Sequence, residues 1–213
     1  MGGSQGVDEW KGLSPERGKW EDKMSMIYGE RVRLRAAERE DVKHYYEWVN
    51  DPEVTRNLAL YLPMSNVDEE RWFEQMLQRD PNEKTLAIEI RAGVPSGDDK
   101  GWKLIGNCAV FGIEWVNSNA ELGIMIGDKT CWDQGYGTEA MTLLLRHCFE
   151  TLNLNRVFLR VYADNTRARR AYEKAGFAEE GRMREAVFKH GRYDDVILMS
   201  VLRSEWNAKK KEK

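Results

Sequence analysis

The sequence predicts an α/β (α+β) fold built on a mixed sheet with helices on both faces. Along residues 30–202 the apolar residues alternate between the two-residue period of strands and the 3.6-residue period of helices. The predicted order is one strand, two helices, three strands, a helix, a strand, a helix and two strands. The strand–helix–strand passage over 119–162 is long enough for a right-handed crossover between parallel neighbours, and the hairpins on either side of it are antiparallel.

The first three elements are a strand and two amphipathic helices. The segment ERVRLRAA (30–37) alternates as a strand does. The segment 39–50 is predicted to be a helix because its apolar residues follow the spacing i, i+3, i+4 and i+7, namely Val42, Tyr45, Tyr46 and Val49. A second helix is predicted over 67–79, since Ser65 and Asn66 can open it and acidic residues fill its first turn.

The remaining elements follow from the same two periods and from turn residues. Three strands are predicted next, at 84–90, 103–115 and 119–127, with a turn-rich loop at 94–101. After them we expect a helix within 131–154, a strand at 156–163, a helix at 165–176 that ends at Gly176, and a hairpin at 177–202 that turns at His190 and Gly191.

The composition is that of one globular domain with short extensions. The 213 residues are 41% hydrophobic and carry 33 basic and 36 acidic side chains, for a net charge of -3. This balance argues against sequence-independent binding of nucleic acid. We expect a flexible leader at 1–27, an N-terminal extension that could instead be an arm packing on a neighbouring subunit through Trp10 and Trp20. One domain is expected at 28–206 and a charged tail at 207–213.

Cysteine and histidine usage indicates a reducing compartment and no metal site. The three cysteines lack C-x-x-C spacing and the three histidines are scattered, these residues being Cys108, Cys131, Cys148, His44, His147 and His190. We therefore expect a cytoplasmic protein with no metal. No membrane is expected as a partner, because no apolar run approaches the ~20 residues of a transmembrane helix. Nucleic acid is not expected either, because of the charge balance. The expected state is a monomer or a homodimer.

A glycine-containing loop is the first feature that points to chemistry. In WDQGYGTEA (132–140), Gly135 and Gly137 lie between a predicted strand and the start of a helix. Glycines permit a tight turn and a close approach of the backbone to a ligand. The free N–H groups and the dipole of a helix N-terminus suit a pyrophosphate. A G-x-G pair alone is often a plain turn, and the dinucleotide and Walker A fingerprints are both absent, since Ala140 stands at the third glycine position.

The second feature is the segment NTRARRAYEKAGF (165–177). Asn165 and Tyr172 are seven residues apart and so lie on one helix face, two turns from each other. Such residues are also common as capping and packing residues. The arginines of this helix can form a solvated face or a clamp for phosphate, these being Arg167, Arg169 and Arg170.

In this order, with a strand between them, the two segments resemble the GNAT superfamily of N-acetyltransferases. The segment 179–206 and the opening RVRLRAAEREDV are similar to the RimJ/RimL-type branch and to spermidine acetyltransferases, and the resemblance covers about 28–206. It implies a mostly antiparallel, seven-stranded sheet with a central parallel pair. Two positions depart from the usual loop, because Trp132 replaces Arg or Gln and Asp133 replaces a frequent glycine. The Asp133 side chain is expected to point away from the diphosphate.

The resemblance implies acetyl-CoA as the co-substrate and gives residues their roles. Backbone amides would hold the pyrophosphate, at Gln134, Gly135, Tyr136, Gly137 and Thr138. The strand ending at Met125 and Ile126 would offer backbone groups to the pantetheine arm, and Asn165 would hydrogen-bond that arm. Arg170 would also contact the cofactor, and Tyr172 would stand near the thioester sulfur as a general acid.

The chemistry of acetyl transfer also requires a neutral amine. A lysine-like amine with a pKa near 10.4 is only about 0.04% neutral at pH 7, so a carboxylate that accepts its proton would help. Glu121 and Glu114 are the candidates, and either can equally be a surface strand residue. The expected function is N-acetylation of a primary amine, which can be a protein N-terminus, a polyamine or a small amine. The alternative is a non-catalytic sensor that binds acyl-CoA.

Overall fold

The computed structural model describes residues 26–91 and 101–211. Most of the predicted leader, with Trp10 and Trp20, and most of the predicted loop at 94–101 lie outside the described residues. Met26 and Ile27, which the sequence assigned to the leader, instead belong to a strand. At the other end a helix runs on to Lys211, so residues 207–211 of the predicted tail are helical.

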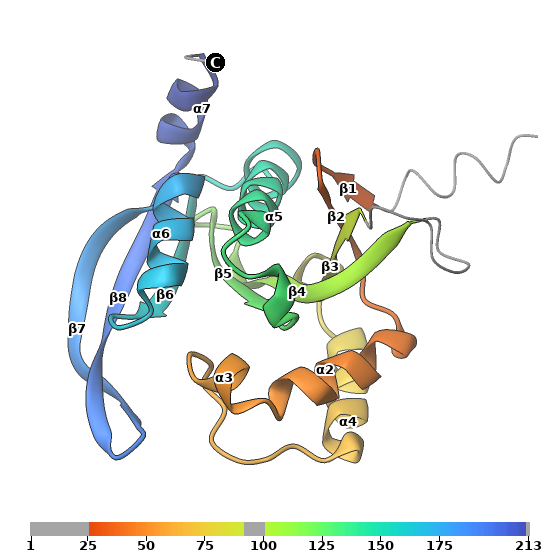
Figure 1. The fold of residues 1–213 in the computed structure, drawn as a ribbon. Coiled ribbons are helices and arrows are strands. Elements are labelled where there is room, and N and C mark those ends of the chain that lie inside the picture. Colours follow the sequence, from red (N-terminus) through yellow and green to blue (C-terminus); the bar gives the residue numbers. More distant parts are fainter. Residues whose placement is uncertain (1–25, 92–100, 212–213) are drawn as a thin grey trace, which may run out of the picture.

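One mixed sheet forms the centre of the fold (Figure 1). Within residues 26–91 and 101–211 it has eight strands in the order β1-β2-β3-β4-β5-β6-β8-β7, and β5 pairs with β6 in parallel while the other neighbours are antiparallel. The strands are β1 (Met26–Tyr28), β2 (Val32–Ala36), β3 (Leu86–Arg91), β4 (Trp102–Glu114), β5 (Asn119–Ile126), β6 (Arg156–Tyr162), β7 (Ala178–Lys189) and β8 (Arg192–Leu202). The mixed sheet with a central parallel pair is confirmed.

The predicted number of seven strands is wrong by one. The additional strand is β1, which pairs with β2 through Met26, Ile27 and Tyr28. Three residues are too few to show a hydrophobic period, and the strand exists because the turn at Gly29 folds it back on β2.

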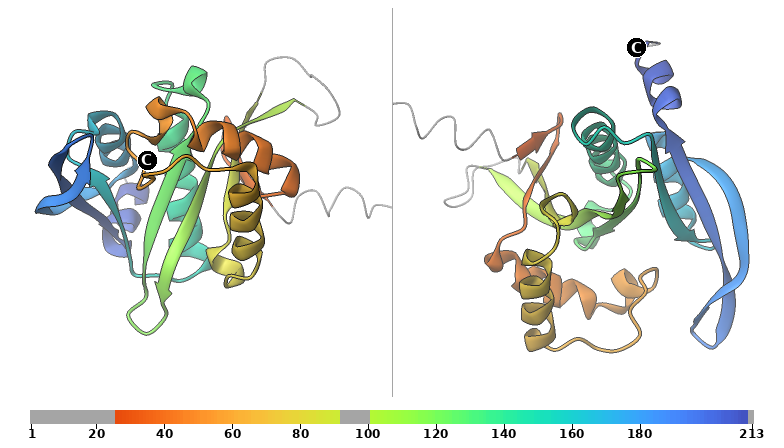
Figure 2. Two further views of the ribbon diagram at one scale, coloured as in Figure 1. Left: turned by 90° about the horizontal axis from the view of Figure 1, so that it is seen from below. Right: turned by 180° about the vertical axis from the view of Figure 1, so that it is seen from behind.

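The helices form two groups (Figures 1 and 2). One group comprises α2 (Val42–Val49), α3 (Pro52–Thr55) and α4 (Asn66–Leu77), and the other comprises α5 (Tyr136–Arg146) and α6 (Thr166–Ala175), with α7 (Arg203–Lys211) at the C-terminal end. The helix that the sequence placed within 131–154 begins only at Tyr136 and ends in a π-helical turn, His147–Thr151. Its start is delayed because residues 129–135 form a short 3-10 turn and the glycine loop.

The two helix groups cover opposite faces of the sheet. Alternate residues of β2 point in opposite directions, as in any strand. Val32 and Leu34 pack into the large core, which also contains buried residues of α5. Arg33 and Arg35 therefore face the other side, where Arg35 reaches Asp41 at the start of α2. Helices on both faces were predicted and are confirmed.

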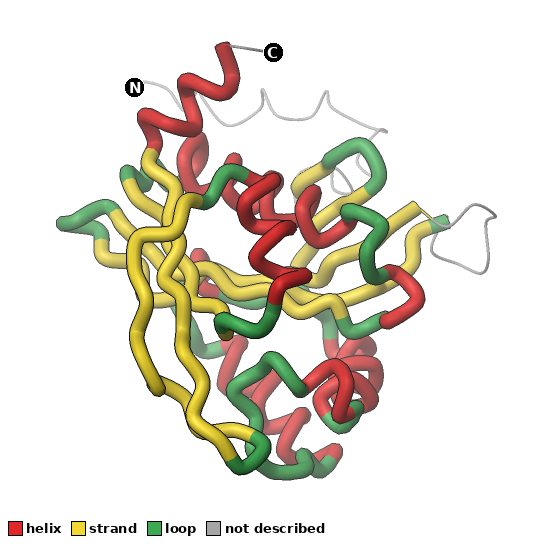
Figure 3. The backbone as a smooth tube through the Cα atoms, turned by 60° about the vertical axis from the view of Figure 1, so that its left-hand side comes forward, coloured by secondary structure: helices red, strands yellow, loops and turns green. Residues whose placement is uncertain are grey.

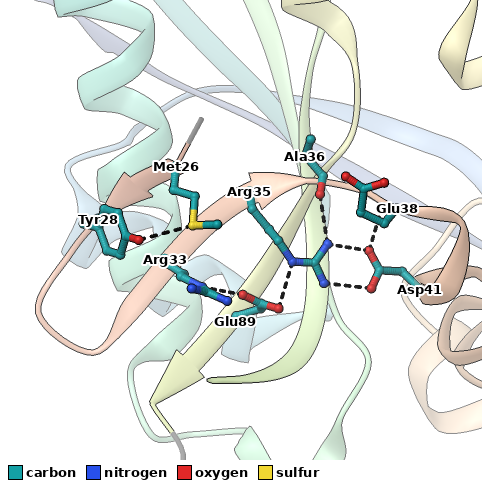
Figure 4. Close-up of polar contacts among 8 residues, drawn as sticks. All are labelled: Met26, Tyr28, Arg33, Arg35, Ala36, Glu38, Asp41 and Glu89. Atoms are coloured by element: carbon teal, nitrogen blue, oxygen red, sulfur yellow. Dashed lines mark hydrogen bonds and ion pairs between the residues drawn. The ribbon is translucent and has the colours of Figure 1, made fainter. Parts of the chain in front are cut away.

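A buried network of charges joins α2 to the edge of the sheet (Figure 4). Glu89, which is 1% exposed, accepts hydrogen bonds from Nε of both Arg33 and Arg35. Arg35 also donates to both carboxylate oxygens of Asp41, at 2.7 and 2.8 Å. Burial opposes the charge on Arg35, but the bonds to Asp41 and Glu89 outweigh it and raise the pKa of that guanidinium. The network fixes α2, whose Tyr45 lines the cleft described below.

Candidate active site

A cleft opens in the sheet where its two parallel strands separate. Within the described chain, β5 and β6 are paired through residues 119–121 and 156–158, although the strands continue to Ile126 and Tyr162. The cleft has a volume of about 1030 Å³. Its walls are both strands, the loop before α5, one side of α6, part of α4 and the segment 57–64.

The glycine loop forms one wall of this cleft. Gly135 has a φ of 83° and Asp133 a φ of 59°, so both adopt the left-handed conformation. This explains why glycine is frequent at the position of Asp133, since aspartate is one of the few other residues that tolerate it. The first backbone bond of α5 runs from the Glu139 N–H to the Gly135 carbonyl at 3.0 Å. The N–H groups ahead of Glu139 thus lie outside the helical ladder and are available to an anion.

Arg31 holds this loop from the turn between β1 and β2. Its Nη1 donates to the Gln134 carbonyl at 3.1 Å, and its Nε pairs with Glu139 at 3.1 Å. Its guanidinium also lies 4.8 Å from the centre of the Tyr136 ring. Sequence reasoning missed Arg31, because its partners are more than 100 residues away and no local pattern links them.

Trp132, which stands where Arg or Gln is usual in this loop, has a structural role. The Trp132 indole donates to the Ile126 carbonyl at 2.8 Å and so ties the loop to the end of β5. Arg167 of α6 stacks on the Trp132 ring at 3.5 Å. The carbonyl of Ile126, which was expected to serve the pantetheine arm, therefore already accepts a hydrogen bond.

The helix α6 brings Asn165 and Tyr172 to the cleft, as predicted from their spacing. Asn165 caps α6, since its side-chain oxygen accepts the N–H of Ala168 at 3.2 Å. The capping role that the sequence left open is thus present, and the amide nitrogen of Asn165 is still able to donate to a ligand. Tyr172 packs against Phe177 at 5.9 Å between ring centres, and burial raises the pKa of Tyr172 to about 12.

The two candidate carboxylates lie in different places. Glu121 of β5 lines the cleft, and its side chain is 24% exposed. Both of its oxygens accept hydrogen bonds from Arg160 of β6, at 2.8 and 2.9 Å. Glu114 instead is exposed at the end of β4, outside the cleft lining, where it accepts the Asn117 amide at 2.7 Å. Of this pair, only Glu121 lines the cleft that Tyr172 also lines.

The three arginines of α6 do not act as one cluster. Arg167 lies on Trp132, and Arg169 pairs with Glu179 at 3.1 Å. Arg170 is exposed and lines the cleft. Arg167 also lines the cleft and Arg169 does not, so two of the three arginines, with Arg170 among them, have positions expected of a cofactor contact.

Sequence reasoning largely missed the half of the cleft that lies away from the glycine loop, which we call the far half. Its walls include Tyr45 of α2 and Glu69 and Trp72 of α4, and Tyr45 packs edge-on against Trp72 at 5.7 Å. Glu69 is only 5% exposed, and burial together with the neighbouring Asp68 raises its pKa. The acidic segment 67–74 carried a signal for this site, but a helix N-terminus is commonly acidic for other reasons.

The splayed parallel strands, the glycine loop and the protonated tyrosine define a GNAT-type acyltransferase. The chain belongs to the acetyltransferase (GNAT) domain family, which matches residues 31–178. This agrees with the resemblance seen in the sequence.

Relatives with assigned names are similar over most of their length. The uncharacterized N-acetyltransferase p20 of Bacillus licheniformis is 31% identical over 183 residues, covering 86% of this chain and 99% of the relative. Spermidine N(1)-acetyltransferase of Vibrio cholerae is 30% identical over 176 residues, covering 81% and 94%. The crystal structure of spermidine N-acetyltransferase from Vibrio cholerae in complex with CoA and spermine aligns with a TM-score of 0.73 at 27% identity, covering 84% of this chain and 99% of that one. No helix in the described part of this chain has the length and apolar character needed to cross a membrane.

Proposed function

We propose that the protein transfers the acetyl group of acetyl-CoA to a primary amine by direct attack on the thioester. The observation that carries this proposal is the single cleft that runs from the glycine loop, past Tyr172 and Glu121, to the buried carboxylate of Glu69. A sensor that only bound acyl-CoA would need the loop but neither the phenol nor a carboxylate in the same cleft. Family membership supports the same choice.

The pyrophosphate of acetyl-CoA would bind to the backbone amides of residues 134–138. Gly137 makes this testable, because its own surroundings leave room for a side chain. A Cβ there would have Ile126 as its nearest neighbour at 3.7 Å, which is an ordinary contact, and the φ of Gly137 is not left-handed. What a larger side chain would obstruct is the approach of a ligand to the backbone.

Changing Gly137→Val is therefore expected to weaken CoA binding by about tenfold or more while leaving the melting temperature nearly unchanged. Titration calorimetry with CoA and a thermal melt are the measurements. Gly181→Val is the matched control, because a Cβ at Gly181 in β7 has open space and the residue does not line the cleft. Unaltered CoA affinity in a folded Gly137→Val protein would remove the glycine loop from the binding site.

The proton transfers fall to two side chains in this mechanism. The ammonium of the acceptor first gives a proton to Glu121, directly or through water, and the neutral nitrogen then bonds to the carbonyl carbon while the carbonyl oxygen takes the negative charge. The bonded nitrogen loses its extra proton to water. When the intermediate collapses, the carbon–sulfur bond breaks and Tyr172 donates its proton to the departing thiolate. The phenol of Tyr172 carries a proton at neutral pH both at its ordinary pKa near 10 and at the value of about 12 to which burial raises it, so a proton is available to the thiolate.

The proposed acceptor is a polyamine. The far half of the cleft offers a buried carboxylate, Glu69, next to the aromatic ring of Trp72, and such groups bind alkylammonium ions. A polyamine has a second ammonium group that can pair with Glu69 while the first amine reacts. The similarity to spermidine acetyltransferase of Vibrio cholerae supports this choice over a protein N-terminus.

An amine panel tests the acceptor. Release of CoA thiol is measured with spermidine, spermine, butylamine and a short peptide with a free N-terminus. We expect kcat/KM for the polyamines to exceed that for butylamine by at least about tenfold, and Glu69→Gln to remove most of this advantage. Preference for the peptide would make the protein an N-terminal acetyltransferase. If CoA bound but no amine released it, the sensor function would replace the enzyme.

A further inference from the structure

Two separate parts of the chain line the cleft and are joined to each other by hydrogen bonds. One is the segment 57–64 between α3 and α4, and the other is β7, which contributes Met183, Ala186 and Val187. Figure 3 shows the tip of the β7–β8 hairpin beside the loop that follows α3. We call these two parts the lips of the cleft. Whatever joins the lips sets the width of the opening through which an acceptor enters.

Lys189 makes this junction. It is the last residue of β7, and the hairpin turns directly after it through His190 and Gly191, whose φ values of 51° and 79° are those of a tight type I′ turn. Its ammonium donates to the carbonyl of Thr55 at 2.6 Å and also to the carbonyl of Leu58. Both carbonyls belong to the opposite lip or to the helix that leads into it.

Aromatic rings complete the surroundings of this ammonium. Its nitrogen lies 6.0 Å from the centre of the Tyr61 ring and 5.7 Å from that of Tyr162, within the range of a cation–π contact. Tyr61 belongs to the first lip and Tyr162 to the end of β6, and both line the cleft. Burial lowers the pKa of Lys189 and the charge of Asp164 opposes this, as expected for an ammonium partly removed from water.

The hydrogen-bond acceptors of Lys189 are backbone carbonyls, and this gives the contact a defined geometry. Backbone carbonyls have fixed positions, unlike the flexible carboxylates that pair with surface lysines, so bonds to them hold the two chain segments at one separation. The Thr55 carbonyl at the end of α3 also accepts the Leu58 N–H at 3.0 Å, so Lys189 is a second donor to a carbonyl whose position the turn already fixes. Lys189 itself does not line the cleft, so it acts on the acceptor site only through the lips.

We propose that Lys189 is a positioning residue that latches the β7–β8 hairpin to the segment after α3 and thereby sets the affinity for the amine acceptor. This rests on the proposed function, because it concerns the acceptor half of the same cleft. The latch predicts that its loss raises the KM for the amine, with little effect on CoA binding. It also predicts that the segment after α3 becomes looser even when no substrate is present.

The test uses Lys189→Met, which keeps the length of the side chain but removes its charge and its donors. We expect KM for the best amine to rise at least fivefold, with kcat within about twofold and the Kd for CoA unchanged. Trypsin should also cleave after the exposed Arg56 several times faster in the free variant than in the wild type. Lys43→Met on the exposed side of α2 is the control, and it should change neither the KM for the amine nor the rate of cleavage after Arg56. Lys189→Arg, which keeps charged donors, should recover most of the affinity.

Two results would overturn the latch. One is a Lys189→Met protein with unchanged KM and unchanged cleavage at Arg56. The other is a parallel loss of melting temperature, CoA affinity and amine affinity, which would make Lys189 a general stability residue. If the wild type acetylated no amine, the proposed function would fail, and the proteolysis result would then decide the latch alone.

Discussion

Replacing Tyr172 with phenylalanine is expected to lower kcat by about 10²–10⁴-fold, the usual effect of removing a general acid. In the proposed mechanism, the thiolate that leaves the tetrahedral intermediate is stabilised by a proton from the phenol. Burial raises the pKa of Tyr172 to about 12, so the hydroxyl is protonated throughout the neutral range. Phenylalanine keeps the ring that packs on Phe177 and removes only the donor.

Steady-state kinetics, CoA titration and a thermal melt separate this role from a structural one. We expect CoA affinity and melting temperature to stay near the wild-type values. Tyr193→Phe on the exposed hairpin is the matched control, since Tyr193 is 63% exposed and does not line the cleft. A Tyr172→Phe enzyme with kcat within a few-fold of the wild type and a lowered melting temperature would show that the hydroxyl serves only the fold.

Replacing Glu121 with glutamine is expected to lower kcat by about 10²-fold or more, with CoA affinity nearly intact. The reason is the charge of the acceptor. Deprotonating a lysine-like amine at pH 7 costs roughly 4.6 kcal/mol, and without a base only the rare neutral amine reacts. Arg160 holds the carboxylate of Glu121 through both oxygens, which fixes it toward the cleft.

The pH dependence and a second carboxylate provide the controls. The neutral fraction of the amine rises about tenfold per pH unit below its pKa, so the difference between wild type and Glu121→Gln should narrow as pH rises. Glu114→Gln is the matched variant and should behave as the wild type, because Glu114 lies outside the cleft lining. Impairment of Glu114→Gln instead would transfer the role to Glu114. If neither variant were impaired, the amine would enter already neutral.

Several parts of the site could be predicted from short stretches of sequence. The spacing of Asn165 and Tyr172 put both on one helix face, and both line the cleft. The glycines of 132–140 marked a loop at a helix start, and the left-handed φ of Gly135 shows why glycine stands there. These features depend on residues within about two helical turns of each other, so a local pattern is sufficient to reveal them.

Other parts depend on contacts between distant residues and left no local pattern. Arg31 donates a hydrogen bond to the glycine loop, and Lys189 donates to the opposite lip. Each of these contacts joins segments that are more than 100 residues apart. The strand β1 is too short for a period, and its pairing with β2 alone defines it. In the sequence, Glu69 is one of the acidic residues that are common in a first helical turn. The structure shows that it is buried and lines the cleft.

The sequence by itself determined the mixed sheet, the parallel crossover, the glycine loop and the helix that carries Tyr172. It did so because hydrophobic period, turn chemistry and helix spacing are local properties. Only the tertiary structure showed that Glu121 lines the cleft and that Glu114 does not, although the two are seven residues apart on neighbouring strands and look alike in sequence. The difference depends on where β5 and β6 separate, and that is a matter of strand pairing between residues more than 30 positions apart, which leaves no local pattern.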